Sequence, residues 1–220
     1  MKKKETSYVD KIMIGTSFLL RILILIEAVT AAWNKNLWLL FLTLCILILT
    51  FIPSFIERNY KINLPLELQF IVVVFISFSL FLGEMRSYYV KFWWWDVLLH
   101  SMSGIVLAFV GFLIVYILYT EKKIRMRPRF VLLFSFCFAV AIGSLWEIVE
   151  FTLDSFLGLQ MQEASLFDTM LDLIVDSISA LIVSVAGYFY VKRKKSSLFF
   201  RHLVERFVKA NPKLFRRKKR

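Results

Sequence analysis

Six long apolar runs constrain this 220-residue chain more than any other feature of its sequence. A helix needs about 20 mostly apolar residues to cross a hydrocarbon core of roughly 30 Å. Backbone groups find no water partner inside lipid, so these runs must be helical, and the alternation typical of barrel strands is absent. The sequence therefore predicts an all-α, polytopic membrane helix bundle. Its six transmembrane spans are expected at residues 12–33, 37–56, 66–85, 97–120, 130–151 and 171–191.

Composition excludes several other classes of protein. Hydrophobic residues make up 59% of the chain, whereas a soluble domain normally has about 45–50%. Cys45 and Cys137 both lie inside apolar runs, so neither a disulfide framework nor a zinc motif is expected. Since no P-loop or dinucleotide-binding glycine motif is present, we expect no nucleotide cofactor. No span is expected to be broken by glycine or proline.

The distribution of basic residues predicts the orientation of the spans. Of the 28 Lys and Arg residues, 24 lie before the first span, after the second, after the fourth or after the sixth. Cytoplasmic loops carry such an excess, so both termini are expected in the cytoplasm and the protein in the plasma membrane. All six tryptophans then fall at the outer interface, where their amphipathic rings are favoured.

Residues 192–220 follow the transmembrane domain of residues 1–191 as a strongly basic tail. Apolar residues recur in it at helical spacing, at Leu198, Phe199, Leu203, Val204, Phe207 and Val208. This pattern predicts an amphipathic helix on the inner leaflet, bound to the bilayer by its apolar face and attracted to anionic lipid. The net charge of +12 would also suit nucleic acid, but no recognition motif accompanies it, so we expect no nucleic-acid partner.

Acidic residues gather at the opposite, outer ends of the last three spans. An ionisable group at membrane depth costs about 2.5–3.5 kcal/mol, so each is a candidate functional residue. Helical spacing places these residues on one face of their helices, because residues three or four apart are neighbours. The candidate ligands of a metal ion are Asp96, His100, Glu147, Glu150, Asp168, Asp172 and Asp176.

A purely structural interpretation exists for some of these residues. Asp96 could cap the fourth span, and Asp168 and Asp172 favourably occupy the first turn of the sixth. If the group binds a metal, its many oxygens and single histidine suit Mg²⁺, Mn²⁺ or Ca²⁺ better than Zn²⁺ or Fe²⁺.

Three short motifs resemble those of a known family. They are Asp96-x3-His100-x3-Gly104, Trp146-Glu147-x2-Glu150 and Asp168-x3-Asp172. In this order they resemble the bacterial membrane-protein family that includes the inner-membrane protein YjdF. The resemblance implies a bacterial multi-pass membrane protein whose motif residues act together, and it implies no substrate.

Three functions remain open from the sequence. The first is a divalent-metal-dependent enzyme that acts on a lipid or envelope substrate from the outer face. The second is a cation or proton-coupled transporter, although below Asp176 the sixth span offers only Ser177, Ser179 and Ser184 as polar residues. The third is a non-catalytic membrane partner protein. The oligomeric state and the path of residues 151–167 also remain open.

Overall fold

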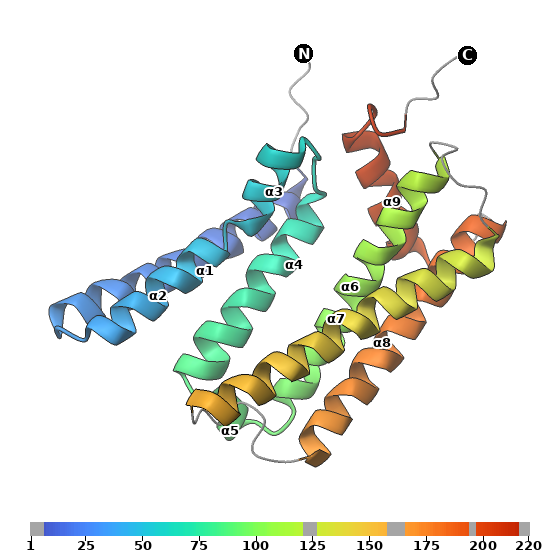
Figure 1. Cartoon of the computed structure of the whole chain (residues 1–220). Coiled ribbons are helices and arrows are strands. Elements are labelled where there is room, and N and C mark those ends of the chain that lie inside the picture. The colour runs from blue at the N-terminus through green and yellow to red at the C-terminus, as the bar shows by residue number, and fades with distance from the viewer. Residues whose placement is uncertain (1–6, 121–126, 158–165, 194–196, 216–220) are drawn as a thin grey trace. The chain divides into compact units, whose positions relative to one another are not determined.

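The computed structural model describes residues 7–120, 127–157, 166–193 and 197–215, and these ranges contain no β-strand. The helices, including the π-helix η1, are α1 Tyr8–Trp33, α2 Leu37–Leu49, α3 Ile52–Tyr60, α4 Leu66–Ile76, η1 Ser77–Met85, α5 Tyr88–Lys91, α6 Trp95–Thr120, α7 Pro128–Leu157, α8 Leu166–Arg193 and α9 Leu198–Ala210 (Figure 1). Five helices of the described ranges are long and apolar enough to cross a membrane, and the bent pair α2 and α3 makes a sixth candidate. The all-α membrane fold expected from the sequence is therefore confirmed.

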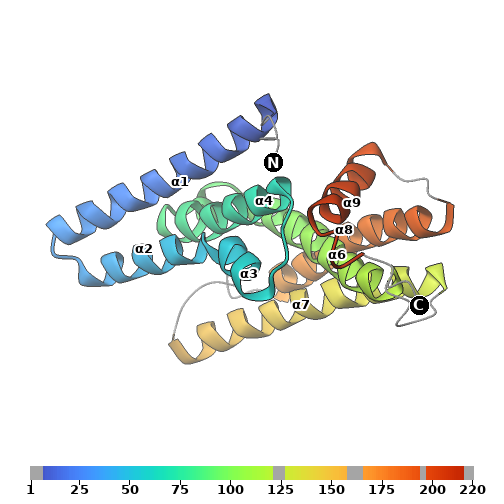
Figure 2. The same cartoon turned by 90° about the horizontal axis from the view of Figure 1, so that it is seen from above.

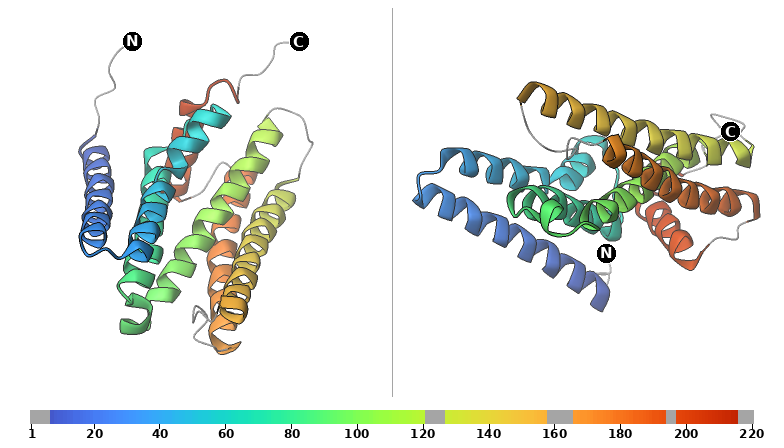
Figure 3. Two further views of the ribbon diagram at one scale, coloured as in Figure 1. Left: turned by 60° about the vertical axis from the view of Figure 1, so that its left-hand side comes forward. Right: turned by 90° about the horizontal axis from the view of Figure 1, so that it is seen from below.

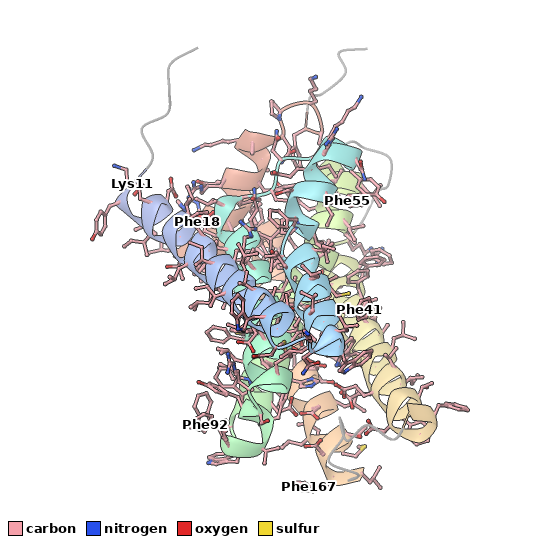
Figure 4. The ribbon with its side chains drawn as sticks, turned by 90° about the vertical axis from the view of Figure 1, so that its left-hand side faces the viewer. Lys11, Phe18, Phe41, Phe55, Phe92 and Phe167 are labelled. Atoms are coloured by element: carbon pink, nitrogen blue, oxygen red, sulfur yellow. The ribbon has the colours of Figure 1, made fainter. Side chains whose placement is uncertain are left out.

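The chain divides into two compact units, within Met1–Phe92 and Trp93–Arg220. In the first unit, α1, α2, α4 and η1 share a small apolar core of Ile24, Ile46, Ile76 and Phe81. Many other apolar side chains of α1 and α2 point outward, as Phe18 and Phe41 do in Figure 4. Such a surface suits helices surrounded by lipid tails, which are as apolar as leucine.

The second expected span is broken, which corrects the expectation that every span is continuous. The chain bends by 45° between α2 and α3. Pro53 lies at the start of α3, and in a continuous helix its ring would clash with the carbonyl four residues earlier, that of Leu49 at the end of α2. Arg21 of α1 covers the end of α2: its Nε donates to Thr50 Oγ1 at 3.1 Å and its Nη2 donates to the Thr50 carbonyl at 2.9 Å.

In the second unit, α6, α7 and α8 lie side by side (Figure 3). Small residues at their contacts allow these helices to approach closely. A Cβ atom at Gly111 of α6 would come within 3.1 Å of Phe138 on α7, and one at Gly187 of α8 within 2.6 Å of the Phe112 ring on α6. The helices that carry the candidate ligands therefore form a tightly packed group.

Helix α9 packs against this group through its apolar side (Figure 2). The ring of Phe200 lies 4.9 Å from that of Phe112, 5.4 Å from that of Phe109 and 6.0 Å from that of Tyr190, measured between centroids. Leu203, Val204 and Phe207 of α9 are also buried. The expected helix is present, but protein rather than lipid covers most of its apolar side, and Leu198 and Phe199 remain exposed.

Candidate metal centre

His100 occupies the second turn of α6 and contacts carboxylates on both sides of its ring. Its Nδ1 atom lies 3.3 Å from Oδ2 of Asp176, which α8 supplies. The other oxygen of Asp176, Oδ1, accepts a hydrogen bond from the Ser103 hydroxyl at 2.7 Å. Beside an ionised Asp176 carboxylate, which only accepts, Nδ1 of His100 is the donor of this contact.

Three further carboxylates surround the other ring nitrogen, Nε2. It lies 3.7 Å from Oδ1 of Asp96, 3.8 Å from Oε1 of Glu147 and 3.9 Å from Oδ1 of Asp172. These oxygens come from α6, α7 and α8 respectively. The separations exceed the 2.7–3.2 Å or so of a hydrogen bond. They lie at or just above the upper end of the range of about 2.8–3.7 Å between neighbouring ligand atoms around an octahedral ion with bonds of about 2.0–2.6 Å.

Glycine residues of α6 and α7 allow this arrangement around Asp176. A Cβ atom at Gly104 would come within 2.8 Å of the Asp176 carbonyl oxygen, and one at Gly143 within 2.5 Å of Asp176 Oδ2. Because Asp176 lies between these two positions, the glycines let one residue of α8 contact both neighbouring helices. Helical spacing places the other members of the group on shared faces: Asp172 and Asp176 are four residues apart on α8, as Asp96 and His100 are on α6.

Most of the group is buried. His100, Glu147, Asp172 and Asp176 are each less than 10% exposed, whereas the side chain of Asp96 is 29% exposed. Among the described residues, none forms a hydrogen bond with the buried Oδ1 atom of Asp172. A buried carboxylate oxygen without a hydrogen bond is costly unless a cation binds it. Asp96 therefore marks the accessible side of a site whose other members are shielded from solvent.

Within the described part of the chain, Asp96, His100 and Asp172 form a group that could hold a metal ion. One ligand atom from each lies within 4.8 Å of the other two. The donors are one imidazole nitrogen and two carboxylate oxygens, which suit a divalent ion. The orphaned Asp172 oxygen and the anchored histidine both fit such an ion.

Comparison with known proteins places the chain in a family. The family model described as "Predicted membrane protein (DUF2238)" matches residues 15–193. The chain belongs to this family. The match includes α6, α7 and α8 with every candidate ligand, and it ends before α9.

A relative of this DUF2238 chain occurs in Thermotoga maritima. The two sequences are 29% identical over 152 residues, which are 68% of this chain and 74% of the relative. The relative is named an uncharacterized protein. No solved structure matches the chain.

Four of the seven ligands expected from the sequence are outside the three-residue group of the DUF2238 chain: Glu147 and Asp176, which contact His100, and also Glu150 and Asp168. Glu150 accepts a hydrogen bond from the Trp146 indole at 2.8 Å on the exposed side of α7. Asp168 is half-buried in the first turn of α8, one turn before Asp172. Neither belongs to the group described above.

The contact of Ser103 with Asp176 was not expected from the sequence. Its position three residues after His100 places both on one face of α6, which is a signal that could have indicated it. The distance from α6 to the acidic face of α8 is set by the packing of the two helices, and no spacing within one helix contains that information.

Proposed function

We propose that this protein is a membrane enzyme that uses one divalent metal ion, bound by Asp96, His100 and Asp172, on a lipid or other envelope substrate. The observation that carries the proposal is the setting of His100. Its Nδ1 atom contacts Asp176, so the other ring nitrogen, Nε2, faces three carboxylates at 3.7–3.9 Å. These like charges repel one another unless a cation lies among them.

The donor set supports Mg²⁺, Mn²⁺ or Ca²⁺ over Zn²⁺ or Fe²⁺. Carboxylate oxygens are hard ligands and dominate the group, and the single imidazole suits Mn²⁺ among the three. No cysteine of the described chain belongs to the group, although soft thiolates are frequent zinc ligands. Mn²⁺ is therefore the first ion to test.

A bound ion of this kind would polarise a carbonyl or phosphoryl group, or activate a water molecule. The residues of the chain support such chemistry in distinct ways. Glu147 lies beside His100 Nε2 and is positioned to accept a proton from the reacting group. Burial of Glu147 and Asp172 excludes bulk water, while the more exposed Asp96 lies where a substrate would enter.

Topology supports a lipid or envelope substrate. We propose that both termini lie in the cytoplasm and that the protein resides in the plasma membrane, so that the metal site opens at the outer leaflet. The exposed indoles of Trp94 and Trp146 lie within two residues of Asp96 and Glu147, and indoles favour the lipid interface. A reporter enzyme active only outside the cytoplasm, fused to the C-terminus, should be inactive; activity would contradict this orientation.

The basic face of α9 supports contact with anionic lipid at the inner leaflet. Arg201 is exposed and pairs with Glu205 at 2.7 Å. That hydrogen bond holds the pKa of Glu205 below its ordinary value, so Glu205 stays charged at neutral pH. Arg206 and Lys209 also lie on α9, so its three basic residues outnumber this single acid and the helix attracts anionic headgroups. The motif resemblance to the family that includes YjdF supports a bacterial membrane protein, but it implies nothing about which lipids are bound.

Elemental analysis of protein purified in nanodiscs tests the metal site. Wild-type protein incubated with Mn²⁺ and then desalted should retain close to one ion per chain, and Asp172→Asn should lose it. Asp168→Asn is the matched control, because it makes the same change one turn earlier on α8 and should keep the ion. Equal loss in both variants would contradict the assignment of Asp172 as a ligand, and no ion in wild type would contradict the site.

Mass spectrometry of lipids tests the enzymatic role. Nanodiscs made from total bacterial lipid should yield a new lipid product with wild-type protein and Mn²⁺, and none with Asp172→Asn or a chelator. A bound ion without any product from lipid or added cell-envelope extract would contradict the enzyme. Ion uptake by proteoliposomes would then support the alternative, a cation transporter.

A further inference from the structure

We propose that Asp176 is a positioning residue rather than a metal ligand: it holds His100 so that Nε2, and not Nδ1, faces the metal. This inference rests on the metal site proposed above. It goes further because it gives the five clustered side chains different roles. Three of them bind the ion, Glu147 lies beside these three, and Asp176 acts through His100.

Both oxygens of Asp176 already have partners on α6. Oδ2 lies 3.3 Å from His100 Nδ1, and Oδ1 accepts a hydrogen bond from Ser103. Nδ1 and Nε2 point in different directions from the imidazole ring, and the other three carboxylates lie around Nε2. Asp176 is therefore on the wrong side of the ring to bind the same ion as Nε2.

The contact between Asp176 and Nδ1 has a known consequence for metal sites. A histidine ligand that donates its second N–H to a carboxylate keeps one tautomer and one ring orientation, and becomes a more basic ligand. Removal of such a partner costs about 10–100-fold in metal affinity. In this chain Asp176 lies at Nδ1, so a neutral imidazole that donates to it has its lone pair on Nε2.

Asp176 is in turn held by its surroundings. The hydroxyl of Ser103 lies 2.7 Å from Asp176 Oδ1 and 2.8 Å from the carbonyl oxygen of His100. On the other side, Gly143 of α7 leaves room for Oδ2, since a Cβ atom there would come within 2.5 Å of it. The carboxylate is thus confined between α6 and α7, which gives the histidine ring one orientation.

A double-mutant cycle on Mn²⁺ affinity tests the inference in nanodiscs, with the free Mn²⁺ signal in electron paramagnetic resonance as the readout. Asp176→Asn should weaken Mn²⁺ binding about 10–100-fold. In a His100→Ala background the same change should have no further effect, because Asp176 acts only through His100. Ser103→Ala should weaken binding in the same direction by a smaller factor, without removing any charge.

Pulsed electron paramagnetic resonance with ¹⁵N-labelled histidine adds a readout that loss of folding alone would not mimic. Wild type should show coupling between Mn²⁺ and a histidine nitrogen, absent in His100→Ala. Ser103→Ala and Asp176→Asn should keep bound Mn²⁺ at saturating concentration with a weaker or altered coupling.

Three outcomes would overturn the inference. Unchanged affinity in Asp176→Asn shows that Asp176 does not support His100. An effect that persists undiminished in the His100→Ala background shows that Asp176 binds the ion directly. Failure of wild type to bind Mn²⁺ overturns the proposed site and this inference with it, and is distinguished from the first two because those require binding by wild type.

Discussion

His100 is held at Nδ1 by Asp176, and Gly143 on a different helix leaves room for that carboxylate. The carboxylate of Asp176 occupies the position where a side chain at 143 would begin. An added methyl group must displace Asp176, which Ser103 and His100 hold in place. A small substitution at the edge of the site should therefore affect both packing and metal binding.

We expect Gly143→Ala to lower the free energy of unfolding by about 1–3 kcal/mol, the usual cost of overpacking. Gly15→Ala is the control, because nothing lies within 4 Å of a Cβ atom there. In a helix this control should gain about 0.5–1 kcal/mol. Chemical denaturation in mixed micelles measures both. Equal stability of the two variants would show that Asp176 moves aside without cost.

At the scale of helices, the break between α2 and α3 depends on one arginine within a membrane span. Arg21 donates to both the side chain and the carbonyl of Thr50, and its guanidinium lies 4.5 Å from the centre of the Phe51 ring. A bend exposes carbonyls at the end of α2 that lipid cannot bind. Arg21 donates a hydrogen bond to one of these carbonyls and so lowers the free-energy cost of the bend within the bilayer.

Thr50→Val removes one acceptor of Arg21 while keeping the side-chain volume. We expect a loss of about 1–3 kcal/mol in unfolding free energy, because the half-buried guanidinium of Arg21 loses one of its two acceptors on Thr50. Thr43→Val is the matched control: both hydroxyls are fully buried in the first unit, but that of Thr43 bonds only to carbonyls of its own helix. The same denaturation experiment compares them, and a larger loss in Thr43→Val would contradict the role given to Arg21.

Two neighbouring phenylalanines at the start of α9 differ in burial. Phe200 is 5% exposed and packs against α6 and α8, whereas Phe199 is 63% exposed. We expect Phe200→Ala to weaken docking of α9 by about 3–5 kcal/mol, the usual cost of removing a buried ring. Faster amide hydrogen exchange in residues 198–210 would report it. Phe199→Ala should leave exchange there nearly unchanged, and similar effects of both would contradict the observed docking.

The outline of these helices was predictable from sequence, because spanning a bilayer requires a long apolar run. The break in the second span was not predicted, since the apolar run over 37–56 continues on both sides of Pro53. The burial of Phe200 was not predicted, because helical periodicity identifies an apolar face but not the helices that cover it. Asp96, His100 and Asp172 were expected to converge, and the structure brings them together. The contacts of Asp176 with His100 and Ser103 depend on packing between helices, which spacing along one helix does not contain.

At the scale of the whole molecule, the candidate ligands all belong to the second unit. Binding of an ion should therefore stabilise one part of the chain more than the other. An ion at 100 times its dissociation constant contributes about 2.7 kcal/mol to the state that binds it.

We expect Mn²⁺ to slow amide hydrogen exchange in α6, α7 and α8 and to leave α1 and α2 almost unchanged. The thermal unfolding midpoint should rise with Mn²⁺ and return to its starting value when a chelator removes the ion. Asp172→Asn should show neither response, whereas the control Asp168→Asn should show both. Equal protection of both units would contradict a site confined to the second one.

The aromatic packing beneath α9 affects how a small molecule could reach the candidate site in the second unit. Phe112 is fully buried and lies against Tyr116, Tyr190 and Phe200, so rings from α6, α8 and α9 fill the end of the bundle remote from the carboxylates. If the proposed enzyme acts at this site, its substrate would enter past Asp96, because these rings lie on the other side of the carboxylates. The product would then leave on the side from which the substrate came.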